Sequence, residues 1–150
     1  MNDLAFKIFK LSASGFCCTQ IMMKLALDEE ESENPDLIRA VHGLCNGIGG
    51  TQKTCGVLSG GIAILGLYAG KGSEQEYARD NFSRMMHEFL EWFEGEFERT
   101  ECEQLIGLTK FEDGDQSYQV KCGDMLVKSY TKICEILSEY DYEIGSRESI

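Results

Sequence analysis

The chain has 150 residues, of which 43% are hydrophobic and 27% charged, and its formal net charge is −12. This length and composition are typical of one globular domain, here residues 1–150, that can bury a core of its own. The acidic charge and the absence of a basic stripe argue against nucleic acid and anionic membrane surfaces as partners.

The N-terminal residues do not have the pattern of a targeting signal. Asp3, Lys7 and Lys10 interrupt the apolar residues of the first fifteen positions, whereas a secretory signal needs an uninterrupted apolar segment. The longest nearly uncharged stretch, residues 56–70, is shorter than the ~20 residues that cross a bilayer. We therefore expect a cytoplasmic protein without membrane insertion.

Apolar residues at helical spacing predict three helices in the first third of the chain. Residues 4–14 and 18–28 give the first two, with a break between them. Asn34 and Pro35 then provide an N-cap and a first helical residue for the third. Its apolar face continues to about residue 45, where a glycine-rich loop begins.

A fourth helix is predicted over residues 55–69, with Thr54 able to cap it and Gly70 closing it. It carries no charge and should be buried at the centre of the protein. Glycine in a helix interior costs about 0.8–1 kcal/mol relative to alanine. The close approach of another helix or of a bulky cluster would offset that cost at Gly56, Gly60, Gly61 and Gly66.

Ser73 and Glu76 have the spacing of a capping box, which predicts a long fifth helix to about Arg99. Large apolar residues recur along one face of this helix, and we interpret them as core residues. They are Tyr77, Phe82, Met85, Met86, Phe89, Trp92, Phe93 and Phe97.

Two further helices are predicted near the C-terminus, a short one over residues 102–106 with Thr100 as its cap and a last one over residues 122–137. The tail from about residue 139 is expected to fray. No segment alternates at period two, so no strand is predicted. The expected fold is all-α, a single-domain bundle of about six to seven helices around the buried glycine-rich helix.

Seven of the 150 residues are cysteine. This cysteine content is lower than the ~8–10% that is typical of a secreted disulfide scaffold. In a reducing compartment, thiols at this number are expected to be ligands, reactive groups or buried apolar side chains. Their positions on the predicted helices help to separate these three roles.

Four cysteines lie in or next to the first turn of a predicted helix: Cys18, Cys55, Cys102 and Cys122. A helix N-terminus offers unpaired N–H groups and a partial positive charge, which favour the thiolate that reacts and binds metal. Gly56, directly after Cys55, leaves bare N–H groups beside that sulfur. If the four N-termini converge, the site suits an iron–sulfur cluster, zinc or a pair of exchanging disulfides.

The remaining cysteines are given other roles. Cys45 and Cys134 lie on apolar faces and are expected to be packing residues. Cys17 is interpreted as a bystander, although it stays open whether Cys17 or Cys18 is the first residue of the site. The two histidines, His42 and His87, are expected at the surface or in caps.

Four stretches of the chain carry a family resemblance. They are Gly15 to Gln20, the segment from Gly49-Gly50 through Cys55-Gly56-Val57-Leu58-Ser59-Gly60-Gly61, Phe97 to Cys102 with Leu105 and Gly107, and Cys122. In these stretches the chain resembles the family of redox-active proteins named for a C-GCAxxG-C-C pattern of four cysteines. Val57 replaces the usual alanine, and Cys17, Cys45 and Cys134 are additional. The resemblance implies a helical protein with a redox role and gives no substrate.

Three hypotheses follow for Cys18, Cys55, Cys102 and Cys122. The first is an iron–sulfur cluster that transfers electrons, the second a thiol–disulfide oxidoreductase that uses two of these residues as catalytic thiols, and the third a structural zinc site in a scaffold protein. The expected partner is a redox protein that the sequence does not identify, and a homodimer stays open.

Overall fold

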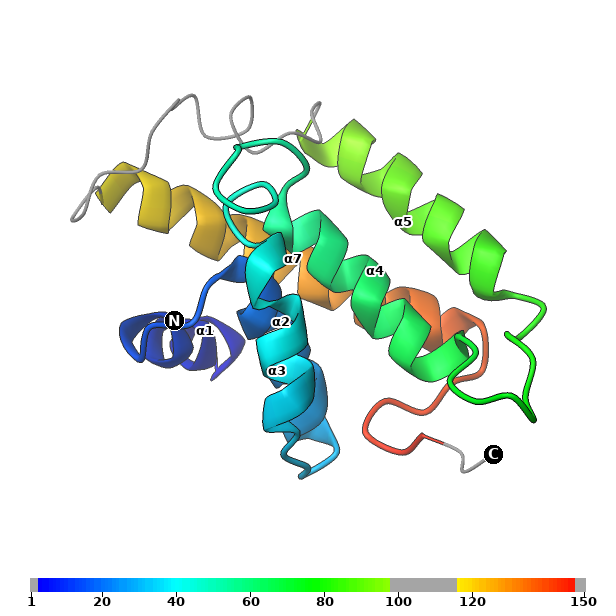
Figure 1. Cartoon of the computed structure of the whole chain (residues 1–150). Helices are drawn as coiled ribbons and strands as arrows, with labels where there is room; N and C mark the ends of the chain where they lie inside the picture. The colour runs from blue at the N-terminus through cyan, green and yellow to red at the C-terminus, as the bar shows by residue number, and fades with distance from the viewer. Residues whose placement is uncertain (1–2, 98–115, 148–150) are drawn as a thin grey trace.

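The computed structural model describes residues 3–97 and 116–147 of the chain (Figure 1). These residues form six α-helices, one 3-10 turn and no β-sheet, so the predicted all-α fold is confirmed. The elements are α1 (Asp3–Ala13), α2 (Cys18–Glu29), α3 (Pro35–Val41), η1 (His42–Leu44), α4 (Gly56–Ala69), α5 (Phe82–Phe97) and α7 (Gln116–Glu139).

Helix α4 lies at the centre of the bundle, in contact with α2, α5 and α7 (Figure 1). Two of its glycines explain how the neighbours approach so closely. A Cβ on Gly60 would lie 2.8 Å from Cβ of Met22 on α2, and a Cβ on Gly61 would overlap the ring of Phe89 on α5. The predicted buried, glycine-rich central helix is therefore confirmed, and close packing accounts for Gly60 and Gly61.

The predicted apolar faces of α5 and α7 form much of the core. Met85, Phe89 and Phe93 of α5 are completely buried, and α7 contributes Met125, Leu126, Tyr130, Ile133 and Leu137. The buried Tyr130 hydroxyl donates a hydrogen bond of 3.3 Å to the Leu25 carbonyl of α2. This bond satisfies the polar end of a side chain that is otherwise packed in hydrocarbon.

Three of the predicted helix ends are found in the structure, one of them shifted by a residue. The Asn34 side chain accepts a 3.1 Å hydrogen bond from the Leu37 amide, which caps α3 as expected. Gly70 ends α4. At the start of α4 the N-cap is Cys55 and not Thr54, so this cysteine stands at the helix boundary itself.

Helix α5 begins at Phe82, nine residues after the predicted cap at Ser73, so that prediction was wrong. Glu76 turns back to accept a hydrogen bond from the Gly72 amide, and the Arg79 amide bonds to the Ala69 carbonyl at 2.8 Å. The intervening residues thus form a turn against the end of α4. Tyr77, predicted to face the core, is 87% exposed because it lies in this turn.

Helix α7 begins at Gln116, six residues before the predicted start at Cys122. The preceding sequence is polar but contains no proline, so nothing in it prevents the helix from extending. Cys122 is therefore inside the helix and not in its first turn, contrary to prediction. The short helix predicted over residues 102–106 lies outside the described residues.

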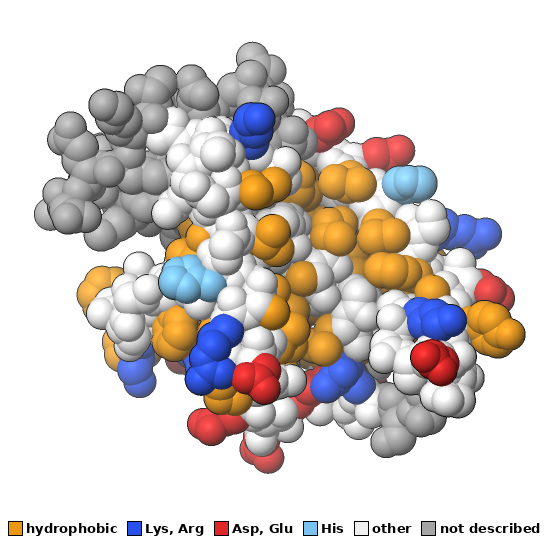
Figure 2. Space-filling view, viewed as in Figure 1, with side chains coloured by type: hydrophobic (Ala, Val, Ile, Leu, Met, Phe, Trp, Pro, Cys, Tyr) orange, Lys and Arg blue, Asp and Glu red, His pale blue; other side chains and the backbone are white. Residues whose placement is uncertain are grey.

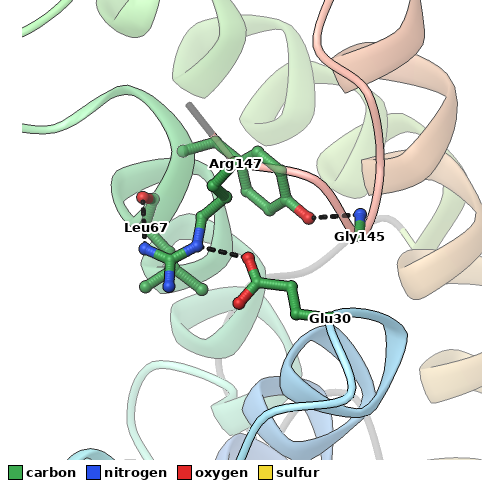
Figure 3. Close-up of polar contacts among 5 residues, drawn as sticks. Glu30, Leu67, Gly145 and Arg147 are labelled. Atoms are coloured by element: carbon green, nitrogen blue, oxygen red, sulfur yellow. Dashed lines mark hydrogen bonds and ion pairs between the residues drawn. The ribbon is translucent and has the colours of Figure 1, made fainter. Parts of the chain in front are cut away.

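The segment after α7 is anchored, which corrects the expectation that the tail frays from about residue 139. The Tyr142 hydroxyl bonds to the Asn81 side chain at 2.8 Å, and the Gly145 amide donates to the Tyr68 hydroxyl at 3.0 Å. Arg147 pairs with Glu30 and donates to the Leu67 carbonyl (Figure 3). These contacts fix the tail through Arg147 across the C-terminal ends of α2 and α4.

Hydrophobic side chains gather across the middle of the face shown in Figure 2, over α4 and α5. The half-buried hydrophobic residues of these two helices that pack against the core include Ile62, Ala63, Leu67, Met86 and Leu90. Among the described helices, none is long and apolar enough to cross a membrane.

Candidate functional site

A disulfide joins Cys17 and Cys45, whose Cα atoms are 6.0 Å apart, a usual separation for such a bond. Cys17 is the N-cap of α2, and Cys45 is the C-cap of η1. Helices α2 and α3 run back along each other, so the start of one lies beside the end of the other. The bond closes this helical hairpin at its open end.

The two sulfur-bearing residues differ in their exposure to solvent. Cys17 is half-buried, whereas Cys45 is only 5% exposed and belongs to the apolar interior. Of the two halves of the bond, the Cys17 side is therefore the more exposed to solvent.

Gln20, which is buried, connects the disulfide to α3. Its Oε1 accepts a 3.3 Å hydrogen bond from the Cys17 amide and lies 3.5 Å from the Cys17 Sγ. Its Nε2 donates to the Ile38 carbonyl at 3.3 Å. If the disulfide opens, this Oε1 is already in position to accept a hydrogen bond from the Cys17 thiol.

Cys18 and Cys55 stand at the starts of α2 and α4, where the two helices meet. Cys18 is half-buried and Cys55 is 4% exposed. A Cβ on Gly56 would lie 3.4 Å from Cβ of Cys18, and the Thr19 hydroxyl donates a 3.0 Å bond to the Gly56 carbonyl. The structure thus brings Cys18 beside the residue that follows Cys55.

The structure gives no side-chain position for the other two predicted site residues. Cys102 lies outside the described residues, and Cys122 lies in α7 with its side chain outside the described part. In the part of the chain that is described, no three His, Cys, Asp or Glu side chains are arranged to hold a metal. The iron–sulfur and zinc hypotheses therefore stay predictions.

The loop between Cys45 and Cys55 has a rare backbone conformation. Asn46 and Ile48 have φ of 53° and 69°, and Gly47, Gly49 and Gly50 also have positive φ. A left-handed conformation at a β-branched residue such as Ile48 is costly and persists only when its surroundings impose it. Here the Gln52 amide bonds to the Asn46 carbonyl and the Lys53 amide to the Gly47 carbonyl, at 3.0 and 2.9 Å.

Cys134 lies on α7, in contact with Tyr130. Burial raises the pKa of its thiol, and the hydrogen bond with Tyr130 lowers that pKa to a smaller extent. A thiol of this kind is a packing residue with little thiolate at neutral pH, in agreement with the prediction for Cys134. His42 and His87 are exposed, also as predicted.

One family model, described as "Putative redox-active protein (C_GCAxxG_C_C)", matches residues 16–136. The chain belongs to this family. No curated protein and no solved structure matches the chain significantly. Membership in the C_GCAxxG_C_C family confirms the resemblance found in the sequence and supports a redox role.

In this C_GCAxxG_C_C protein, sequence reasoning missed the Cys17–Cys45 pair. It interpreted Cys17 as a bystander and Cys45 as a packing residue. One signal could have found it. Helix α2 has 12 residues, and α3 and η1 together form a return arm of similar length with 7 and 3 residues. When the two arms of a helical hairpin have similar lengths, the residue before the first arm lies opposite the residue after the second arm. Here these residues are Cys17 and Cys45.

Proposed function

We propose that this C_GCAxxG_C_C protein is a thiol–disulfide oxidoreductase that works through Cys17 and Cys45. The observation that carries the proposal is a disulfide with one accessible and one buried half, Cys17 and Cys45. In the cytoplasm, the compartment that the sequence favours, disulfides are usually transient and belong to catalysis or redox sensing.

The reaction begins from the reduced protein, with both residues as thiols. The N-terminus of α2 favours the thiolate at Cys17, its N-cap, whereas the nearby Gln20 Oε1 favours the thiol. The thiolate form attacks one sulfur of a substrate disulfide. A mixed disulfide forms between Cys17 and that sulfur, while the other substrate sulfur leaves as a thiolate and takes up a proton.

Cys45 completes the exchange. It loses its proton and attacks the Cys17 Sγ, which forms the Cys17–Cys45 bond and releases the second substrate sulfur as a thiol. Two electrons pass from the protein to the substrate, and two substrate thiols can return them by the reverse steps. The burial of Cys45 reserves it for this intramolecular step.

A trapping experiment tests the proposal. The Cys45→Ser variant should accumulate a mixed disulfide at Cys17 when it is mixed with a small disulfide, because the resolving thiol is absent. The Cys17→Ser variant should form none there, and Cys134→Ser should behave as the unaltered protein does. Mass spectrometry of the cysteine-containing peptides measures all three. Failure of the unaltered protein to lose and regain two hydrogens at this pair would refute the proposal.

An iron–sulfur cluster is the second candidate, supported by the position of Cys18 beside Gly56, the residue that follows Cys55. Such a cluster would be held by these two residues with Cys102 and Cys122, and it would supply one-electron transfer. Gly56 fits this role because the absence of a Cβ lets Cys18 and Thr19 approach the start of α4.

Metal analysis separates the two candidates. Protein prepared without oxygen should contain iron and acid-labile sulfide if the cluster is correct, and Cys55→Ser should lose both. Protein free of iron after reconstitution would exclude the cluster, and zinc in the same analysis, with unfolding on chelation, would indicate the structural site instead.

A further inference from the structure

A pocket of about 340 Å³ opens between α2 and α3 beside the disulfide. Its wall includes Phe16, Gln20, Lys24, Leu27, Pro35 and Ile38. This volume is at the lower end of the ~300–1,000 Å³ of small-molecule sites, so the pocket admits a small ligand and not a folded partner.

Cys17 does not line the pocket itself, but two of its neighbours, Phe16 and Gln20, do. Phe16 directly precedes Cys17 in the chain, and the Gln20 Oε1 is 3.5 Å from the Cys17 Sγ. A ligand lodged against Phe16 and Gln20 is therefore one side chain away from the sulfur that reacts first.

The chemistry of the wall defines the ligand. Phe16, Leu27 and Ile38 offer apolar surface, and Lys24 places its Nζ 5.2 Å from the centre of the Phe16 ring. Within the described part of the chain, no carboxylate pairs with Lys24. In a protein with a net charge of −12, this pocket thus holds a local positive charge available to an anion.

The other charged residues at the pocket leave that balance in place. Arg39 is already paired with Asp36 at 2.7 Å, and both side chains are largely exposed. Glu33 is exposed and would disfavour a carboxylate placed directly beside it. A ligand carboxylate therefore has one favoured position, near Lys24 and the Phe16 ring.

We infer that this pocket binds the substrate of the exchange, and that the substrate is a short peptide disulfide carrying at least one carboxylate. The inference rests on the proposed function, since it supplies the disulfide that the Cys17 thiolate attacks. The carboxylate binds Lys24, the apolar wall holds the peptide, and its sulfur is directed to Cys17. Two electrons and the leaving thiolate move as in the exchange described above.

Binding is tested apart from the exchange with S-methylglutathione, which has two carboxylates and cannot form a disulfide. In a chemical-shift titration of the oxidised full-length protein, we expect the perturbed residues to line this pocket. The Lys24→Gln variant should bind about fivefold more weakly, the size of one exposed charge pair. Absence of perturbation at the pocket, or equal binding by the variant, would overturn the inference.

Lys10→Gln is the matched control, since Lys10 also lies over a phenylalanine ring, that of Phe6 at 5.5 Å, but lines neither pocket described for the chain. It should bind S-methylglutathione as the unaltered protein does. Equal losses for the Lys10 and Lys24 variants would mean that only overall charge matters, which contradicts a built site.

The rates at which the reduced protein reacts with two small disulfides show whether the peptide-binding inference or the proposed exchange reaction has failed. The reduced protein should react faster with glutathione disulfide than with uncharged 2-hydroxyethyl disulfide, and Lys24→Gln should reduce only the first rate, by roughly fivefold. Equal rates with both reagents would overturn the inference and retain the exchange. No reaction of the Cys17–Cys45 pair with either reagent would refute the proposed function.

Discussion

Cys17 and Cys18 are adjacent in the chain but belong to different contacts. Cys17 is bonded to Cys45, while Cys18 lies beside Gly56 at the start of α4. Successive residues of an α-helix are separated by about 100° around its axis, because one turn takes 3.6 residues. The two neighbouring cysteines at the start of α2 thus meet different elements, Cys17 meeting Cys45 at the end of η1 and Cys18 meeting the start of α4.

Cys134 provides a prediction at the residue scale. Because burial raises the pKa of its thiol, little thiolate forms near pH 8, and iodoacetamide should label it much more slowly in the native protein than in urea. The native labelling rate should increase as the pH is raised. Peptide mass spectrometry measures the rates, and native labelling as fast as that in urea would contradict the prediction.

Ile48 provides a second prediction at the residue scale. Its φ of 69° is a left-handed conformation, and its side chain is 45% exposed. Asparagine tolerates this conformation, so Ile48→Asn should raise the free energy of unfolding by about 1 kcal/mol. Ile48→Val is the control, because valine keeps the branched side chain and its strain. Urea unfolding measures both, and a loss of stability in the asparagine variant would show that the Ile48 side chain is needed.

At the scale of the elements, two glycines of α4 should respond in opposite directions to alanine. Gly60→Ala places a methyl group against Met22 Cβ and the α2 backbone, and should cost about 1–3 kcal/mol of stability by overpacking. Gly66→Ala meets only the Phe82 ring, at 3.7 Å, and should gain up to ~1 kcal/mol from helix propensity. Thermal or urea unfolding compares them, and a gain for both would mean that α2 and α4 can move apart freely.

The helices were largely predictable from the sequence, because their apolar residues repeat at the period of the helix. Their starts were less so. The pair Ser73 and Glu76 has the spacing of a capping box, yet Glu76 accepts from Gly72 in a turn. A local signal of this kind is satisfied equally by a turn or by a helix, and long-range contacts such as that of Arg79 with Ala69 decide between them.

The candidate site was predictable only in part, for a related reason. The helix-start positions of Cys18 and Cys55 could be read from local patterns, and they do lie at the α2–α4 junction. The pairing of Cys17 with Cys45 spans 28 residues and depends on how α2 and α3 pack. An apolar face predicts that Cys45 is buried, but not what it is buried against.

At the scale of the whole molecule, reduction of the disulfide should lower stability. Closing a chain segment of 28 residues removes entropy from the unfolded chain worth about 3–4 kcal/mol. Urea unfolding with and without reductant measures the loss, and Cys45→Ser should show no further loss on reduction. If the reductant leaves the unfolding midpoint of the unaltered protein unchanged, the bond does not constrain the unfolded chain.

Alkaline pH should also destabilise the protein. Burial raises the pKa of Tyr68, Tyr130 and Cys134, so the folded chain keeps protons that the unfolded chain releases near the ordinary values of 9.0 and 10.0. Stability is therefore full below about pH 9 and decreases as the pH rises further. The unfolding midpoint measured from pH 8 to 11 tests this, with Tyr130→Phe expected to flatten the decline.

The interlock of Thr19 with Gly56 has a mechanical consequence. The threonine hydroxyl holds the glycine carbonyl, and the space where a methyl group would stand is already filled by Thr19 and Cys18. Because Thr19 and Cys18 are already in close contact with Gly56, the first turns of α2 and α4 must move together. Opening the bond at Cys17, one residue before the first turn of α2, would then displace the start of α4 at Cys55 through the Thr19–Gly56 contact.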